Sequence, residues 1–305
     1  MLALLTGCGA TEPHPHPPER GGSRCALPPS PRKAWRHHSL GALLASGTAA
    51  HHVALDALVP AQQSGTLRGK FAYGPTSKDL EDEQIEGFWF DGNCTAHQLG
   101  TALTNDDGRV QFTLPPLPAG TYQAALRVSG DGTIAHANLY VVAANATAVL
   151  FDIDGTLTND DGELFEDLLG GTADMRPAAN QTAARFAAAG HTVVYMTGRP
   201  YFLREHTIAW LQQRGFPPGP VFTVDHMQQT LPTASGVGTW KTQQLQRLVA
   251  SGVTFARAYG NANTDVCAYV RAGFAPANIF ILGRSTPPTC DGQAVQALPS
   301  YTTPH

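Results

Sequence analysis

The stretch VLFDIDGT at residues 149–156 decides the fold class of this chain. Its leading apolar residues predict a buried strand, and the carboxylates of Asp152 and Asp154 project to the same side because side chains alternate along an extended chain. In an open α/β sheet, ligands bind beyond the carboxyl ends of the strands. Two like charges this close need a compensating cation or a bound proton, so the stretch predicts a Mg²⁺ site at this edge. The same letters begin a calcium-binding loop, but Leu157 stands where such a loop carries its glycine.

Apolar strands alternate with helical segments from residue 148 onward. We expect strands at 149–151, 192–196, 221–224, 255–259 and 279–282, and helices at 178–189, 201–214, 239–249 and 263–272. Strands that are apolar throughout are typical of a parallel sheet covered by helices on both faces. Residues 148–290 are therefore predicted to form a doubly wound α/β domain, followed by a C-terminal tail at 291–305. The intervals 157–176 and 224–238 are too short for a further domain over the site, because independent domains begin near about 50 residues.

Polar groups follow the later strands at the same predicted edge. Thr197, Gly198 and Arg199 offer a hydroxyl, backbone amides and a guanidinium near a helix start, where phosphate binds favourably. Lys241 begins a later helix and can place a positive charge on a phosphoryl group. The loop GNANTD at residues 260–265 supplies side-chain oxygens suited to a metal ion. Each group alone is a weak signal, but the ordered set on successive strand ends is specific.

This ordered set resembles the four motifs of the haloacid dehalogenase superfamily of phosphotransferases. Residues 174–284 are most similar to the lipin-type phosphatase domain, and especially to the lipin-like domain of membrane-associated phosphatidylinositol transfer proteins. The matching text includes MRP at 175–177, YMTGRP at 195–200 and DVCAY at 265–269. The resemblance implies a haloacid-dehalogenase-like fold without a cap domain. Lipins also combine their catalytic domain with an immunoglobulin-like module.

The resemblance implies a role for each motif residue. Asp152 is expected to be the nucleophile that carries the phosphoryl group, and Asp154 the general acid and base. Mg²⁺ is expected to contact Asp152, the backbone carbonyl of Asp154 and either Asn261 or Asp265, a choice that the sequence leaves open. The residues expected to hold the substrate phosphoryl group are Thr156, Thr197, Gly198, Arg199 and Lys241.

The function that the resemblance implies is that of a Mg²⁺-dependent phosphomonoesterase. It would act through an aspartyl-phosphate on phosphatidate or a related lipid phosphate, with peripheral contact to a membrane. A non-catalytic module that binds phosphatidic acid or another phospholipid is the alternative, and a phosphatase for soluble metabolites is a third option. In the lipin-like domain of the animal transfer proteins the nucleophilic aspartate is replaced, whereas this chain keeps both Asp152 and Asp154. This difference favours an enzyme.

Residues 65–147 show short β-rich runs separated by turns rich in glycine, aspartate and proline. The runs expected as strands are 67–73, 86–90, 110–114, 122–128 and 133–142. Regular spacing of this kind is typical of a small antiparallel immunoglobulin-like sandwich. No catalytic groups cluster in this region, so we expect it to serve as a packing module.

Residues 1–60 are rich in proline and histidine and are expected to form a solvated linker. Residues 5–8 read LTGC and resemble a bacterial lipobox, although no basic segment precedes them and the apolar stretch is short for a signal peptide. Lipidation of Cys8 would place the chain at the cell envelope, on the periplasmic face. Without lipidation, a cytoplasmic location is expected. A short helix that packs on the sandwich is expected within 40–59.

Composition excludes several classes of protein. Twenty Lys and Arg residues against 24 Asp and Glu residues give a net charge of −4, which removes the broad basic surface typical of nucleic-acid binding. No apolar run reaches the length of about 18 residues that a membrane-spanning helix needs.

The cysteines beyond Cys8 lack the CxxC spacing of zinc sites, and the sequence leaves their pairing open. They are Cys25, Cys94, Cys267 and Cys290. The expected partner is a phosphorylated lipid or another phosphomonoester, and no protein partner is inferred.

Overall fold

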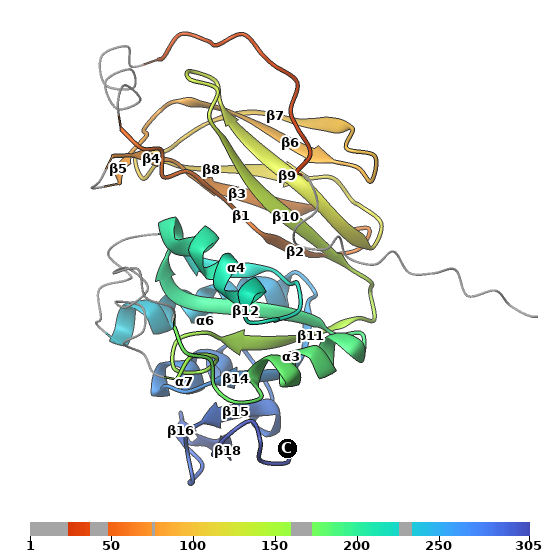
Figure 1. The fold of residues 1–305 in the computed structure, drawn as a ribbon, viewed down its shortest axis with the longest axis vertical. Helices are drawn as coiled ribbons and strands as arrows, with labels where there is room; N and C mark the ends of the chain where they lie inside the picture. Colours follow the sequence, from red (N-terminus) through yellow and green to blue (C-terminus); the bar gives the residue numbers. More distant parts are fainter. Residues whose placement is uncertain (1–23, 37–47, 75–76, 160–172, 226–233) are drawn as a thin grey trace, which may run out of the picture.

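The computed structural model describes residues 24–36, 48–74, 77–159, 173–225 and 234–305, and it shows a β-sandwich on top of an α/β domain (Figure 1). The predicted order, a β-sandwich followed by an α/β domain with a parallel sheet, is confirmed. Among the helices of the described ranges, none is long and apolar enough to cross a lipid bilayer.

The sandwich is built from two sheets that face each other across an apolar core. The first sheet has the order β1 (Val53–Leu55), β3 (Gly65–Lys70), β8 (Arg109–Leu114). The second has the order β2 (Ala57–Pro60), β10 (Ile134–Val142), β9 (Gly120–Val128), β6 (Gln84–Phe90), β7 (Ala96–Leu103). A small hairpin, β4 (Ala72–Tyr73) with β5 (Lys78–Asp79), lies beside them. Strand β8 shows the alternation that builds the core, because Val110, Phe112 and Leu114 are buried while the residues between them are more exposed.

The sandwich starts earlier in the chain than the sequence predicted. Strands β1 and β2 occupy part of the segment 40–59, where a short helix was expected, and Ala54 and Val59 belong to the sandwich core. Each strand is too short to display a periodicity of its own, so pairing with β3 and β10 decides the conformation. Cys25 forms a disulfide with Cys94, which ties a piece of the expected N-terminal linker to the sandwich. Cys8 lies outside the described residues.

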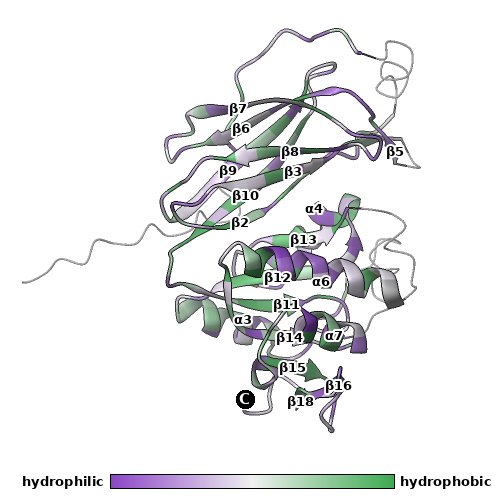
Figure 2. Cartoon of the chain, turned by 180° about the vertical axis from the view of Figure 1, so that it is seen from behind, coloured by the Kyte–Doolittle hydropathy of each residue, from purple (hydrophilic) through white to green (hydrophobic). Residues whose placement is uncertain are grey.

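The α/β domain has a six-stranded parallel sheet with helices on both faces. Its order is β13 (Val221–Val224), β12 (Thr192–Pro200), β11 (Thr147–Asp152), β14 (Thr254–Gly260), β15 (Ile279–Leu282), β18 (Gln296–Leu298). Helices α6 (Ala234–Ala250) and α7 (Asn263–Arg271) share a core with one face, and α3 (Ala179–Ala188) and α4 (Arg204–Gln213) share a core with the other. In Figure 2 the strands β11 and β15 are largely green, as expected for strands buried on both faces.

The C-terminal residues extend this sheet, although the sequence indicated a tail at 291–305. Strand β18 pairs with β15, and a short hairpin of β16 (Thr289–Cys290) and β17 (Gln293–Ala294) precedes it. Val295, Leu298 and Tyr301 are buried, and this burial holds the segment against the domain. The two intervals judged too short for a cap lie in part outside the described residues, at 160–172 and 226–233.

A buried polar contact joins the two domains. Asp56, between β1 and β2, is 4% exposed and forms an ion pair with Arg204 of α4. The other carboxylate oxygen of Asp56 accepts a hydrogen bond of 3.0 Å from the backbone N–H of Val221 in β13. Leu58 and Tyr140 of the sandwich pack into the same apolar cluster as the α6 face of the sheet. The sandwich is therefore fixed against the β13 side of the α/β domain.

Candidate active site

The carboxyl ends of neighbouring strands bring the motif residues together. Asp152 is the last residue of β11, Thr197 lies in the C-terminal half of β12, and Gly260 ends β14. Since β11 lies between β12 and β14, these strand ends are adjacent at one edge of the sheet. Lys241 reaches the same edge from α6.

Asp152 is held in the interior by two donors. Its Oδ1 lies 2.5 Å from Nζ of Lys241, and its Oδ2 accepts a hydrogen bond of 2.9 Å from the Thr156 hydroxyl. The residue is 2% exposed. Burial, together with the nearby charge of Asp265, raises the pKa of Asp152 to about 8, although Lys241 opposes that shift. A further cation beside Asp152 would lower that pKa and favour the ionised carboxylate.

Asp154 is the more accessible carboxylate, with 19% of its side chain exposed. The Thr197 hydroxyl donates a hydrogen bond of 2.6 Å to Oδ2, and Nε of Arg199 donates one of 2.9 Å to Oδ1. The guanidinium of Arg199 is itself buried, and the backbone N–H of Arg199 donates to the Thr197 hydroxyl over 3.0 Å. Thr197 and Arg199 are thus directed at Asp154 and fix the orientation of its carboxylate. Gly198 lies between them in β12 and contributes backbone alone.

Lys241 bridges two carboxylates, because its Nζ also lies 2.6 Å from Oδ1 of Asp265. Burial alone would lower the pKa of Lys241, but the charges of Asp152 and Asp265 outweigh it and raise that pKa. The second oxygen of Asp265 accepts hydrogen bonds of 3.1 Å from the backbone N–H groups of Asn261 and Ala262, where α7 begins. A Cβ atom on Gly260 would lie 2.6 Å from Cβ of Asp265, so only glycine allows this close approach.

Of Asn261 and Asp265, Asn261 is the better candidate ligand for a magnesium ion at this edge of the sheet. Both carboxylate oxygens of Asp265 are already engaged, and the residue is fully buried. Asn261 is half-buried, and its Oδ1 lies 3.2 Å from the Thr156 hydroxyl that also contacts Asp152. Within the described ranges, no three His, Cys, Asp or Glu side chains lie close enough together to hold a metal alone. Mg²⁺ commonly uses one or two carboxylates and completes its shell with water and phosphate. Asp152, the Asp154 carbonyl and Asn261 form such an oxygen set.

Sequence reasoning gave no role to Arg176. Its Nε donates a hydrogen bond of 2.8 Å to the backbone carbonyl of Gly155. Gly155 has a φ of +67° and forms the turn that carries Asp154 away from β11. The Thr158 hydroxyl supports the same turn by accepting a hydrogen bond of 2.9 Å from the N–H of Gly155. The MRP tripeptide at 175–177 contained this arginine, but nothing in the spacing indicated its contact.

Both halves of the chain match models of known protein domains. Residues 50–141 match the model described as "PITM 1-3, beta-sandwich domain". Residues 149–283 match the model described as "PITM 1-3, LNS2 domain". The first match begins near β1 and supports a sandwich that includes residues of the expected linker.

The curated relatives are large animal proteins. The chain is 30% identical over 270 residues to human membrane-associated phosphatidylinositol transfer protein 1, with 85% of this chain and 20% of that protein covered. It is 29% identical over 273 residues to human membrane-associated phosphatidylinositol transfer protein 2, and the match covers 85% of this chain and 19% of that protein. It is 28% identical over 266 residues to the Drosophila melanogaster protein retinal degeneration B, covering 84% of this chain and 20% of that protein. The chain thus spans about a fifth of the length of the relatives it matches.

These relatives correct the location expected from the N-terminus. The prediction of a bacterial lipoprotein anchored through Cys8 is wrong, because the matching proteins are eukaryotic and are named as membrane-associated phosphatidylinositol transfer proteins. The four letters of a lipobox are short enough to occur by chance.

Proposed function

We propose that this chain, whose two domains match the sandwich and LNS2 models of phosphatidylinositol transfer proteins, is a Mg²⁺-dependent phosphomonoesterase of the haloacid dehalogenase type. Phosphatidate or a related lipid phosphate is the proposed substrate. The observation that carries the proposal is the setting of Asp152, a buried carboxylate at a strand end between Lys241 and Thr156. A partly exposed second carboxylate, Asp154, follows two residues later. This pairing suits covalent catalysis with a separate proton donor.

In the proposed first step, an oxygen of Asp152 attacks the phosphorus of the substrate. The bond from phosphorus to the ester oxygen breaks, and Asp154 gives its proton to the departing alcohol. In the second step, water attacks the phosphorus of the aspartyl-phosphate, Asp154 takes up the proton, and Asp152 is released as a carboxylate. The exposure of Asp154 supports this role, since it must meet both the alcohol and the water.

Lys241 supports the same reaction through its charge. Its Nζ lies within 2.6 Å of both Asp152 and Asp265, so its position is fixed before substrate binds. A preorganised charge of this kind stabilises the negative oxygens of a phosphoryl group in the transition state. Mg²⁺, when held by Asp152, the Asp154 carbonyl and Asn261, would supply further positive charge to those oxygens.

Thr197 and Arg199 are proposed to position Asp154 and not to bind the substrate phosphate. Both side chains are buried, and both donate to the Asp154 carboxylate. The pair therefore holds the proposed proton donor in one rotamer. Thr156 has a comparable role toward Asp152.

A non-catalytic module that binds phospholipid is the second candidate, and the names of the human relatives, which are phosphatidylinositol transfer proteins, favour it. Phosphate release from phosphatidate in mixed micelles, with and without Mg²⁺, separates the two functions. The phosphatase predicts Mg²⁺-dependent release that Asp152→Asn abolishes. A binding module predicts that wild type and Asp152→Asn both bind phosphatidate vesicles while neither releases phosphate. Release that is faster from a soluble sugar phosphate than from phosphatidate would keep the chemistry and overturn the lipid substrate.

A further inference from the structure

A polar groove runs between the sandwich and the α/β domain, away from Asp152 and Lys241. It has a volume of about 580 Å³ and is lined by residues of β3, β7, β8 and α6 together with the residue that follows β13. We call it the arginine groove and define it by Arg68, Asn105, Arg109, Gln111, Asp225 and Arg247. In Figure 2, α6 lies below the sandwich on the side that faces the viewer.

The backbone of each element directs its arginine toward the groove. Leu67 of β3 is fully buried in the sandwich core, so the next residue, Arg68, points to the opposite face of the sheet, toward α6. Leu245 of α6 is buried in the core of the α/β domain, and Arg247 lies exposed in the last turn of the same helix. Two guanidinium groups from different domains are thereby brought to one groove.

The protein offsets the positive charge of this pair only in part, because Asp225, which also lines the groove, attracts Arg68 without forming an ion pair with it. Asp225 and Asp107 both pair with Arg109, at 3.4 Å and 3.3 Å. Among the residues that the structure describes, Arg68 and Arg247 form no ion pair and no side-chain hydrogen bond. Burial lowers the pKa of Arg68 and the charge of Arg247 lowers it further, while the charge of Asp225 opposes the shift without cancelling it. Two arginines that repel each other across a groove are stabilised when an anion binds between them.

We propose that the arginine groove is a second anion site, separate from the catalytic edge, and that Arg68 and Arg247 bind the doubly charged phosphate group of a phosphomonoester. Guanidinium groups present paired N–H donors that match phosphate oxygens, and two of them neutralise a dianion. The side-chain amides of Asn105 and Gln111 line the groove and offer further polar contacts. The ligand is either a soluble phosphate ester or a lipid headgroup at a membrane surface.

The position of the groove bears on how a membrane-bound substrate approaches Asp152. Asp225 directly follows β13, so one side of the groove lies at the carboxyl ends of the strands, the edge that carries Asp152. Strand β12 alone separates β13 from β11 in the sheet. A headgroup held by Arg68 and Arg247 would bring the bilayer toward the catalytic edge. The adjoining interdomain cavity, about 180 Å³ and lined in part by Leu58 and Trp240, is too small for two acyl chains, so the ligand's phosphate carries the recognition.

The test compares the full chain with the Arg68→Gln/Arg247→Gln double variant and with Arg185→Gln. Arg185 is the matched control because it is an exposed arginine in the last turn of another helix, α3, away from the groove. Glycerol 3-phosphate is titrated calorimetrically into each protein without Mg²⁺, which prevents turnover. We expect the double variant to bind about tenfold more weakly or worse, since it loses two charge-assisted contacts, and Arg185→Gln to bind like wild type. Hydrolysis of p-nitrophenyl phosphate with Mg²⁺ should be the same in all three proteins.

Vesicles distinguish the two sources of the phosphate. If the natural ligand is a lipid headgroup, the double variant loses sedimentation with phosphatidylcholine vesicles that contain phosphatidate, and Arg185→Gln keeps it. If the natural ligand is a soluble phosphate ester, the double variant binds glycerol 3-phosphate more weakly than wild type in the titration, but the two proteins sediment equally with the vesicles. Equal behaviour of wild type and the double variant in both assays, including no binding by either, would overturn the proposal. This result is independent of catalysis, which the hydrolysis assay reports separately.

Discussion

Asp152 and Lys241, which are 89 residues apart in the sequence, meet with 2.5 Å between Oδ1 and Nζ at the carboxyl edge of the parallel sheet. Both side chains are almost fully buried, and Lys241 reaches Asp265 on its other side. A buried charge with its partners in place is tolerated, whereas a buried charge that has lost its partner is costly. The stability of this edge and its proposed chemistry therefore depend on the same lysine.

Replacing Lys241 by methionine should destabilise the protein strongly. The change leaves Asp152 and Asp265 without their cation, and loss of a buried partner typically costs about 3–5 kcal/mol. The free energy of unfolding in urea measures the effect. Lys33→Met is the control, because the Lys33–Glu86 pair has a lysine that is 47% exposed, and such pairs contribute about 1 kcal/mol or less. Equal losses in the two variants would contradict the buried bridge.

Replacing Arg199 by lysine should lower kcat while KM stays close to its wild-type value. Lysine keeps the positive charge but cannot reproduce the planar contact that Arg199 makes with Asp154 through Nε and Nη2. A loss of about 10- to 100-fold in kcat is expected for a misplaced proton donor. Steady-state kinetics with phosphatidate in mixed micelles provide both constants. A raised KM with unchanged kcat would instead assign Arg199 to phosphate binding.

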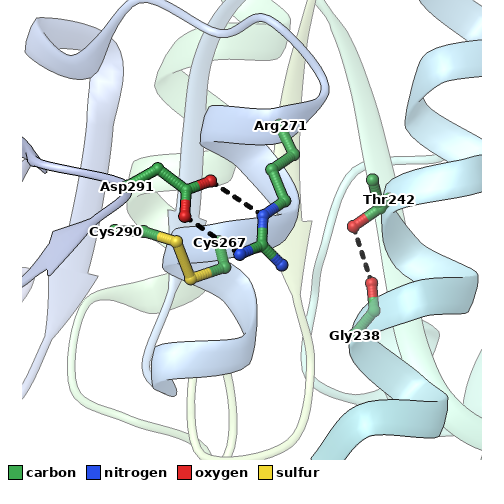
Figure 3. Close-up of a disulfide and its surroundings, with 6 residues drawn as sticks. All are labelled: Gly238, Thr242, Cys267, Arg271, Cys290 and Asp291. Atoms are coloured by element: carbon green, nitrogen blue, oxygen red, sulfur yellow. Dashed lines mark hydrogen bonds and ion pairs between the residues drawn. A yellow bond between two sulfur atoms is a disulfide. The ribbon is translucent and has the colours of Figure 1, made fainter.

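Removing the disulfide between Cys267 and Cys290 should lower the stability of the α7 region. Figure 3 shows this disulfide beside the ion pair of Arg271 and Asp291. It closes a loop with a sequence separation of 23, and loops of this size gain about 3 kcal/mol from the cross-link. We expect Cys267→Ser/Cys290→Ser to lower Tm in calorimetry. Thr242→Val is the control, because the Thr242 hydroxyl donates a hydrogen bond to the Gly238 carbonyl of its own helix, as Figure 3 shows. A double serine variant as stable as Thr242→Val would show that the disulfide adds nothing.

His52 should make the protein sensitive to acid. Burial lowers the pKa of His52 from 6.5 to about 4, and the ring packs against Phe71 and Tyr73. Between these pH values the unfolded chain binds a proton at His52 and the folded protein does not. The free energy of unfolding therefore falls as the pH drops from about 6.5 toward 4, and the contribution of His52 is fully present above about pH 6.5. The loss between neutral pH and about pH 4.5 is about 2 kcal/mol. His52→Gln, which cannot titrate, should show a smaller change in urea midpoint over this interval. An unchanged pH dependence would show that His52 is not responsible.

The position of the site was predictable, but its internal contacts were not. Parallel strands end at a common edge, so Asp152, Thr197 and Asn261 could be assigned to one place from the strand pattern alone. The direction of a side chain depends on packing, and the spacing around Arg199 did not reveal that its guanidinium faces Asp154. The same holds for the choice between Asn261 and Asp265, which rests on backbone hydrogen bonds at the start of α7.

Short strands and distant pairs were the other elements that the sequence did not reveal. Strands β1, β2 and β18 have three or four residues each, which is too few for a periodic pattern. Strand β7 is mostly half-buried and contains Gly100, so it lacks a clear apolar face. The contact of Asp56 with Arg204 joins residues 148 apart, and the partners of the four paired cysteines are likewise set by the folded chain.

The measurement that tests the central claim most directly is the capture of the phosphoryl group on Asp152. Purified protein is mixed with phosphatidate and Mg²⁺, the reaction is quenched in acid during the first turnover, and the peptides are identified by mass spectrometry. The account predicts a phosphorylated peptide that carries residues 149–156, with the phosphoryl group on Asp152 and none in the Asp152→Asn protein. Rapid Mg²⁺-dependent phosphate release by the Asp152→Asn protein, or a phosphoryl group trapped on another residue, would contradict it.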